Sequence, residues 1–157
     1  MTANYFESTV KYLKVHEDGR EKKVSELYLI DAMSFTETEQ ISCEELNKIT
    51  KGDCYISAIK KSKITEVVES NDEMDDRWYK AKIAIIDADE VSGKEKSSYQ
   101  YYLVAASNIN RALENLEKSL STFVVPYEIC SLSDTNFVDV IRYNPGSNEA
   151  IKTLGNE

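Results

Sequence analysis

The sequence predicts an α+β protein formed by tandem duplication of a β-β-α-β unit, with two helices packed on mostly antiparallel sheet. Similar blocks of residues recur in the same order, each about 73 positions after its first occurrence. Each copy opens with two alternating apolar and polar segments around a polar turn, which indicates a β-hairpin. A capped, periodic segment follows each hairpin and predicts a helix.

The repeat is clearest in the strands, where paired aromatic residues and apolar positions coincide. The offset between the copies lengthens by one residue in the second hairpin, and the order of the blocks never changes. Such agreement is hard to obtain by chance, so we interpret the chain as two copies of one unit. The aligned blocks are residues 5–10 with 78–83, 27–32 with 101–106, 55–59 with 128–132 and 64–68 with 137–141.

The hairpins come first in each copy. In the first copy apolar and polar residues alternate over residues 6–12, the polar turn 16–20 follows, and a second strand is expected over 24–30. Residues 78–86 and 98–104 repeat this pattern in the second copy. Each copy therefore begins with two antiparallel strands.

Helices follow the hairpins. Ser34 with Glu37 three residues later is a capping-box signature, and it predicts a helix over residues 35–49. Asn108 caps the second helix, whose apolar residues share one stripe. The members of that stripe are Ile109, Ala112, Leu113, Leu116 and Leu120.

A third strand closes each copy, over residues 54–68 and 127–141, and each is long enough to bend or to break into two pieces. We expect one compact domain overall. Its parts are a first repeat (1–70), an exposed acidic linker (71–76), a second repeat (77–143) and a flexible tail (144–157).

Charge and composition exclude several classes of protein. The net charge of −9 and pI near 4.8 would repel a phosphate backbone, so nucleic-acid binding is disfavoured. No segment has the apolar length of a signal peptide or a membrane span, so we expect a cytoplasmic protein without a membrane partner. The three cysteines form no CxxC pair, and we expect them to be reduced and buried.

No constellation of residues argues for catalysis. His16 is the single histidine, it falls in a polar turn, and no second histidine completes a metal site or a dyad. The acidic runs lack the spacing of a calcium loop, and no phosphate-binding glycine loop or GxSxG motif occurs. We therefore expect no catalytic residue, no metal, no cofactor and no enzymatic activity; a hydrolase built on clustered carboxylates is the weakest alternative.

The unusual feature is the pairing of tyrosines with lysines in the predicted strands. One sheet face rich in both side chains could bind a nucleotide or a protein. A simpler interpretation is that strands favour tyrosine and that edge strands use lysine against unwanted pairing. The candidate binding residues are Lys60, Lys61, Lys63, Lys22, Lys80, Tyr28, Trp78 and Tyr79.

The two copies differ in the polar residues of their third strands. Lys60, Lys61 and Lys63 align with Ser133, Asp134 and Asn136, which suggests that the first copy's third strand has a task that the second lacks. Unpaired sheet edges and the internal pseudo-symmetry also favour a homodimer.

Three segments carry a resemblance to a known family. They are Lys22 to Glu39 (KKVSELYLIDAMSFTETE), Ile59 to Ile64 (IKKSKI) and Asp76 to Lys80 (DRWYK). The chain resembles the family catalogued as domain of unknown function 4494 from about Tyr5 to Ile141. That family is found chiefly in Bacteroidetes, their phages and their mobile elements, so the resemblance implies a small intracellular protein carried by such an element.

The leading hypothesis is a non-enzymatic binding protein of phage or mobile-element origin that sequesters a host component. That component would be a defence protein or a nucleotide signal, so the expected partner is a host protein or a nucleotide-like small molecule. The alternative is an accessory factor of phage replication or recombination, or a virion component, that acts through protein or single-stranded nucleic-acid contacts.

Overall fold

The computed structural model describes residues 4–50 and 52–142. They form eight strands and two helices, which confirms the α+β class. The predicted tail (144–157) lies outside the described residues. The elements are β1 (Tyr5–Val15), β2 (Glu21–Asp31), α1 (Phe35–Ile49), β3 (Cys54–Lys61), β4 (Ile64–Val68), β5 (Arg77–Ala88), β6 (Glu95–Ala106), α2 (Ile109–Leu120), β7 (Tyr127–Asp134) and β8 (Phe137–Ile141).

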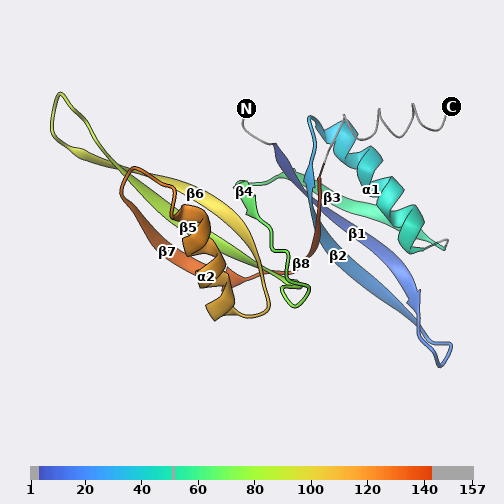
Figure 1. The fold of residues 1–157 in the computed structure, drawn as a ribbon. Helices are drawn as coiled ribbons and strands as arrows, with labels where there is room; N and C mark the ends of the chain where they lie inside the picture. The colour runs from blue at the N-terminus through green and yellow to red at the C-terminus, as the bar shows by residue number, and fades with distance from the viewer. Residues whose placement is uncertain (1–3, 51, 143–157) are drawn as a thin grey trace, which may run out of the picture.

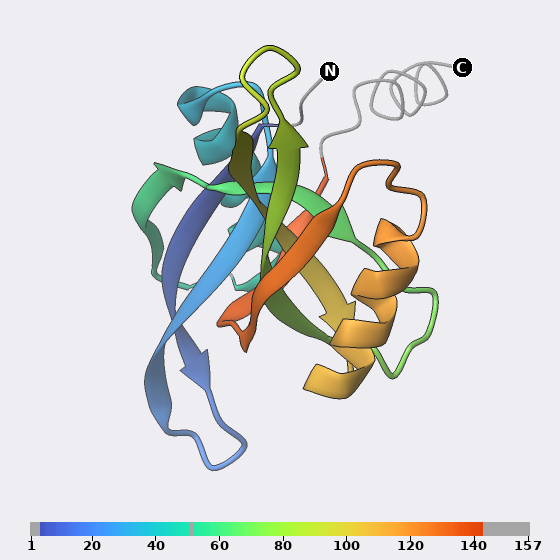
Figure 2. The same cartoon turned by 90° about the vertical axis from the view of Figure 1, so that its left-hand side faces the viewer.

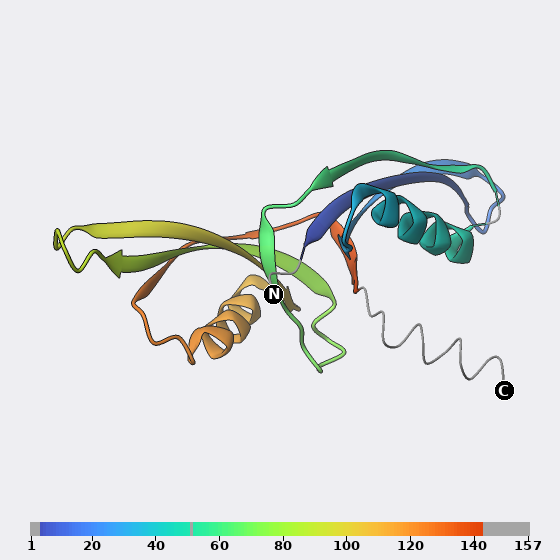
Figure 3. The ribbon, with the colours of Figure 1, turned by 90° about the horizontal axis from the view of Figure 1, so that it is seen from above.

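The strands form two four-stranded sheets. The first sheet has the order β3-β1-β2-β8 and the second has the order β4-β6-β5-β7. In each sheet the hairpin and its third strand pair antiparallel, and the fourth strand pairs parallel. The hairpin tips point in opposite directions (Figure 1, Figure 2), and both helices lie on the same side of the molecule, below their sheets in Figure 3.

The fourth strand of each sheet comes from the other half of the chain. β4 follows β3 but pairs with β6 in the second sheet, and β8 follows β7 but pairs with β2 in the first. Both crossing strands lie in the middle of the molecule (Figure 1). The sequence analysis allowed each third strand to break in two, but it did not predict this reciprocal exchange.

A hydroxyl residue marks each break. Ser62 Oγ accepts a hydrogen bond from Ile64 N at 3.1 Å, and Thr135 Oγ1 accepts one from Phe137 N at 3.3 Å. This turn geometry directs the chain out of the sheet that contains the preceding strand, β3 or β7. The same hydroxyls donate to the first strand of their own half, to Glu7 Oε2 and to the Trp78 carbonyl.

The pairing register is the same in both halves. The β1–β3 register shifts between Thr9 and Val10, and the β5–β7 register shifts between the aligned residues Lys82 and Ile83. The parallel pairs β2–β8 and β4–β6 each shift once, also at aligned positions. The two halves therefore share strand order, bulges and break points, while their origin by duplication stays a prediction.

Three clusters of buried side chains hold the structure together. One lies between α1 and the first sheet and one between α2 and the second. The third, which we call the seam cluster, joins the two sheets through the faces that the helices do not cover. Its buried members are Tyr5, Leu29, Ile64 and Leu103, and Val67, Trp78, Tyr101, Phe137 and Val140 pack against them.

Both helices begin where the sequence predicts. Ser34 Oγ accepts from Glu37 N at 3.1 Å, and Asn108 Oδ1 accepts from Arg111 N at 2.9 Å. The return bond of a capping box is absent within the described residues, because Glu37 Oε1 is buried without a hydrogen-bond partner.

The expectation of buried cysteines was wrong, since none of the three is fully buried. Cys43 and Cys130 are exposed, and Cys54 is half-buried. Cys43 follows the buried Ser42 and lies on the outer side of α1, whereas Cys130 is the unpaired bulge residue of β7.

The seam cluster leads to the first prediction. Leu29 has no exposed surface, so Leu29→Ala should lower the free energy of unfolding by about 2–5 kcal/mol. Because the cluster joins both sheets, Trp78 fluorescence and far-UV circular dichroism should report one coincident transition in urea. Val91→Ala, at a side chain 97% exposed, is the control. Two separate transitions in the wild type would contradict this account.

Candidate functional site

The face of the second sheet that α2 leaves uncovered carries a regular array of lysines and tyrosines. Lys80 and Lys82 alternate along β5 with side chains that point into the α2 core, and Tyr99 and Tyr101 alternate along β6. Lys80 Nζ lies 5.0 Å from the centroid of the Tyr101 ring, and Lys82 Nζ lies 4.4 Å from that of Tyr99. We call these four residues the Lys–Tyr ladder.

The two lysines of the ladder lie outside the ion pairs of the described residues. No ion pair within residues 4–50 and 52–142 includes Lys80 or Lys82, although both side chains are half-buried. Ser133 and Ser131 of β7 lie opposite them and are exposed. Glu128, opposite Ala84, is the carboxylate that shares this face on β7. Two ammonium groups on aromatic rings are thus presented beside neutral hydroxyls.

The corresponding face of the first sheet is different. Glu7 occupies the position of Lys80, and its carboxylate pairs with Lys60 Nζ at 3.7 Å and accepts from Ser62 Oγ at 2.8 Å. Thr9 and Leu27 occupy the positions of Lys82 and Tyr101. The fold therefore does not by itself require the ladder, which belongs to the second half alone.

The predicted site residues do not converge. Lys60 and Lys61 are exposed on β3, Lys63 lies at the break before β4, and Lys22 is near the far end of the first hairpin. Of the eight, only Lys80 belongs to the ladder. Tyr28 and Tyr79 are 7% and 4% exposed and belong to the helix-side cores, whereas Trp78 packs on the seam cluster.

Sequence analysis had not selected Lys82, Tyr99 and Tyr101. The signal was present as Lys80-x-Lys82 on one strand and Tyr99-x-Tyr101 on the next, since both spacings place two side chains on one face. Whether the two pairs face each other depends on the hairpin register, which sets Lys82 opposite Tyr101.

Residues 4–143 match the family described as Domain of unknown function (DUF4494). The chain belongs to this family. The match includes every strand and helix of the structure, so the unit that defines DUF4494 contains both sheets and both crossing strands. No curated protein and no solved structure matches this DUF4494 chain.

The described residues of this DUF4494 protein contain neither a metal-binding cluster nor a membrane-crossing helix. Among the described residues, no three His, Cys, Asp or Glu side chains are grouped so that they could hold a metal ion. In the same part of the chain, neither helix has the length and apolar character needed to cross a bilayer.

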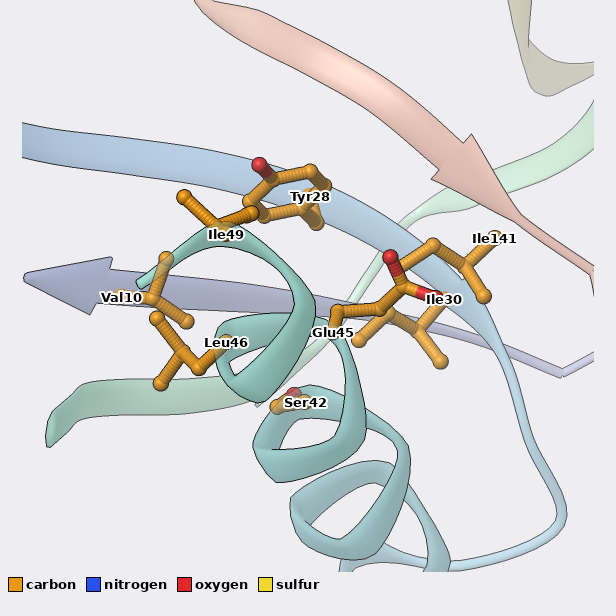
Figure 4. A pocket seen from close by; sticks show the side chains of 8 residues that line it. All are labelled: Val10, Tyr28, Ile30, Ser42, Glu45, Leu46, Ile49 and Ile141. Atoms are coloured by element: carbon orange, nitrogen blue, oxygen red, sulfur yellow. The ribbon is translucent and has the colours of Figure 1, made fainter. Parts of the chain in front are cut away.

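Two hollows border the first sheet, and neither is lined by a predicted lysine. One is a shallow, open depression beside β3, formed by Glu39 and Ile56 to Ile59. The other is a narrow gap beneath α1 that has no room for a water molecule (Figure 4). Its lining residues are Val10, Tyr28, Ile30, Ser42, Glu45, Leu46, Ile49 and Ile141.

The gap beneath α1 arises from small polar residues in the core. With the helix caps aligned, Ser42 of α1 occupies the place of Leu116 in α2, and Ser8 of β1 that of Ala81 in β5. The two serine hydroxyls share a buried hydrogen bond of 2.7 Å. The core beneath α1 thus contains a hydrogen-bonded pair of serines where the core beneath α2 contains alanine and leucine.

This comparison supplies a second prediction. Ser8→Ala with Ser42→Leu copies the second half and should raise the free energy of unfolding by about 1–2 kcal/mol, because it replaces two buried hydroxyls by an apolar pair like Ala81 and Leu116. Ser42→Leu alone should be less stable than the double variant. The Ser8 hydroxyl stays buried without its partner, which costs about 1–3 kcal/mol. Urea denaturation measures both. A double variant no more stable than the wild type would mean that the helix cannot accept the larger side chain.

Burial raises the pKa of two tyrosines near Glu26. Burial, followed by the hydrogen bond from the hydroxyl to Glu26 and the charge of that carboxylate, raises the pKa of Tyr12 to about 12. Burial and the Glu26 charge also raise the pKa of Tyr28, whose hydroxyl donates to Glu26 Oε1 at 3.2 Å. These phenols are neutral hydrogen-bond donors near pH 7 rather than nucleophiles.

The densest polar cluster surrounds Asp75, in the segment predicted to be an exposed linker. Its carboxylate is 1% exposed and accepts hydrogen bonds from Ser70 Oγ, Ser107 N at 3.0 Å, Arg111 Nε at 3.3 Å and Asn115 Nδ2 at 3.4 Å. Burial alone would raise the pKa of Asp75, but the bonds from Ser70, Arg111 and Asn115 outweigh it and lower that pKa. The cluster ties the linker to the start of α2 and is structural.

The third prediction concerns acid stability. Because the pKa of Asp75 is lower in the folded chain than its usual 3.8, ionised Asp75 stabilises the fold above that pH, and this stabilisation is lost as pH falls through the folded pKa. Asp75→Asn should therefore be less stable at pH 7 and approach the wild type below pH 3.8. Asp72→Asn, 51% exposed and 3.9 Å from Arg111, is the matched control. A deficit for Asp75→Asn that stays constant from neutral to acid pH would refute the assignment.

Proposed function

We propose that this DUF4494 chain is a non-enzymatic binding protein of a phage or mobile element, and that it sequesters a host protein. The observation that carries the proposal is the position of its accessible lysines and tyrosines, which lie on an open sheet face rather than in a hollow. A small ligand needs a concave site that buries most of its surface. An open face suits the broad surface of a macromolecule.

The nucleotide-signal version of the hypothesis is less well supported. Neither hollow brings lysines together, and the gap beneath α1 is lined mainly by apolar side chains and closed to water. Tyr28 and Tyr79, which could stack on a base, are buried in the helix-side cores. A host defence protein is therefore the better partner for this scaffold.

The alternative class, a factor acting on single-stranded nucleic acid, is favoured by the ladder alone. Aromatic rings beside cations on a sheet are the elements of a strand-binding surface. However, the ammonium groups of Lys80 and Lys82 occupy positions over the tyrosine rings, where a base would stack. The net charge of −9 also opposes a densely charged polyanion.

Homodimerisation remains a further proposal. β3 and β8 are the edges of the first sheet, and β4 and β7 are those of the second, so each sheet leaves strands paired on one side only within the chain. Bulges in the β3 and β7 pairings blunt those two edges.

The fourth prediction separates sequestration from catalysis. A tagged full-length chain should retain a protein from a Bacteroidetes lysate, and the purified partner should lose its activity in proportion to added chain, with an endpoint near one partner per chain. Excess partner should restore activity, because a sequestering protein is consumed by its target. Inactivation by a small fraction of an equivalent would show an enzyme instead. Saturable heat on calorimetric titration with cyclic nucleotides would favour the small-ligand hypothesis.

A further inference from the structure

We infer that the Lys–Tyr ladder is a docking surface for an extended acidic segment of a protein partner. This inference deepens the proposed function and rests on it for its biological setting. The ladder consists of Lys80, Lys82, Tyr99 and Tyr101, on the face of the second sheet opposite α2.

The first step is the unusual state of the two lysines. The chain has 28 acidic and 19 basic side chains, so carboxylates are abundant. Even so, no described carboxylate lies within ion-pair distance of Lys80 or Lys82, whereas Lys60 on the first sheet is paired with Glu7. Ammonium groups that lie on aromatic rings without a carboxylate partner keep most of their capacity to bind an anion.

The second step is spacing. Lys80 and Lys82 are two residues apart on one strand, so their side chains repeat at about 6.6 Å. An extended segment with carboxylates at alternate positions has the same repeat, and it can therefore pair with both lysines at once. The hydroxyls of Ser131 and Ser133, opposite the lysines on β7, lie beside this track as further donors.

The third step is selectivity between polyanions. The −9 net charge disfavours a ligand with a charge on every unit more than one with a few spaced carboxylates. A carboxylate can bind at the edge of an ammonium that stays on its ring, but a stacked base must displace the ammonium from the ring. The ladder thus fits an acidic peptide better than a nucleic-acid strand.

The experiment uses the full chain and a synthetic peptide of alternating Glu and Thr, twelve residues long. Fluorescence anisotropy of the labelled peptide at low salt should show saturable binding that weakens as NaCl is raised. K80Q/K82Q should weaken it at least tenfold. K80R/K82R, which keeps both cations, should stay within about threefold of the wild type.

The matched control is K94Q/K96Q, which removes the same charge at the tip of the same hairpin, outside the ladder. Its affinity should remain within about twofold of the wild type. Circular dichroism and thermal unfolding confirm that each variant is folded, and NMR should show peptide-induced shifts at Tyr99 and Tyr101.

Three results would overturn the inference. If K80Q/K82Q and K94Q/K96Q lost peptide affinity equally, net charge alone would explain the binding. No shift at Tyr99 and Tyr101 with millimolar peptide would remove the site. Tighter, ladder-dependent binding of a twelve-residue oligothymidylate would replace the acidic peptide by single-stranded nucleic acid.

The proposed function fails separately. If K80Q/K82Q retains the host protein as well as the wild type does, sequestration stands and only the ladder is wrong. If the wild type retains no host protein but binds the peptide through the ladder, the docking chemistry stands and sequestration is wrong.

Discussion

The reciprocal exchange of β4 and β8 is the constraint on which the rest of the structure depends. Each sheet obtains its fourth strand from the opposite half, and the side chains of the two crossing strands supply Ile64, Val67, Phe137 and Val140 to the seam cluster. The strands end in an ion pair between halves, with Arg142 Nε 2.7 Å from Glu69 Oε1. That pair is exposed and contributes little, so the exchange is held by apolar burial and parallel backbone pairing.

The exchange also limits how much of the second face of each sheet is exposed. A ββα unit alone would bury one sheet face under its helix and leave the other exposed along its whole length. Here the ends of both uncovered faces meet at the seam, where Leu29 and Leu103 are fully buried. The outer parts of these faces stay open, and the ladder runs from there to the seam: Lys82 lies on the exposed Tyr99, and Lys80 lies on Tyr101, which packs against the seam cluster.

Local features were predictable because local physics determines them. Side-chain capping set the start of α1 after Ser34 and of α2 after Asn108, and alternation revealed the hairpins. The sequence could not show that β4 pairs with β6 in the second sheet. A strand has the same alternation of side chains in whichever sheet it pairs. Asp75 was missed for a similar reason: its burial depends on Arg111, 36 residues away, and not on its acidic neighbours.

Charge distribution gives the two sides of the molecule different roles in any encounter. α1 carries Glu37, Glu39, Glu44 and Glu45 against the single Lys48, so this helix repels an anionic partner, whereas the charges of α2 balance. At physiological salt this repulsion fades within about 8 Å, whereas contact at the ladder is governed by Lys80 and Lys82 themselves. If the ladder binds an acidic segment as we propose, α1 would repel that partner while Lys80 and Lys82 would attract it to the open sheet face.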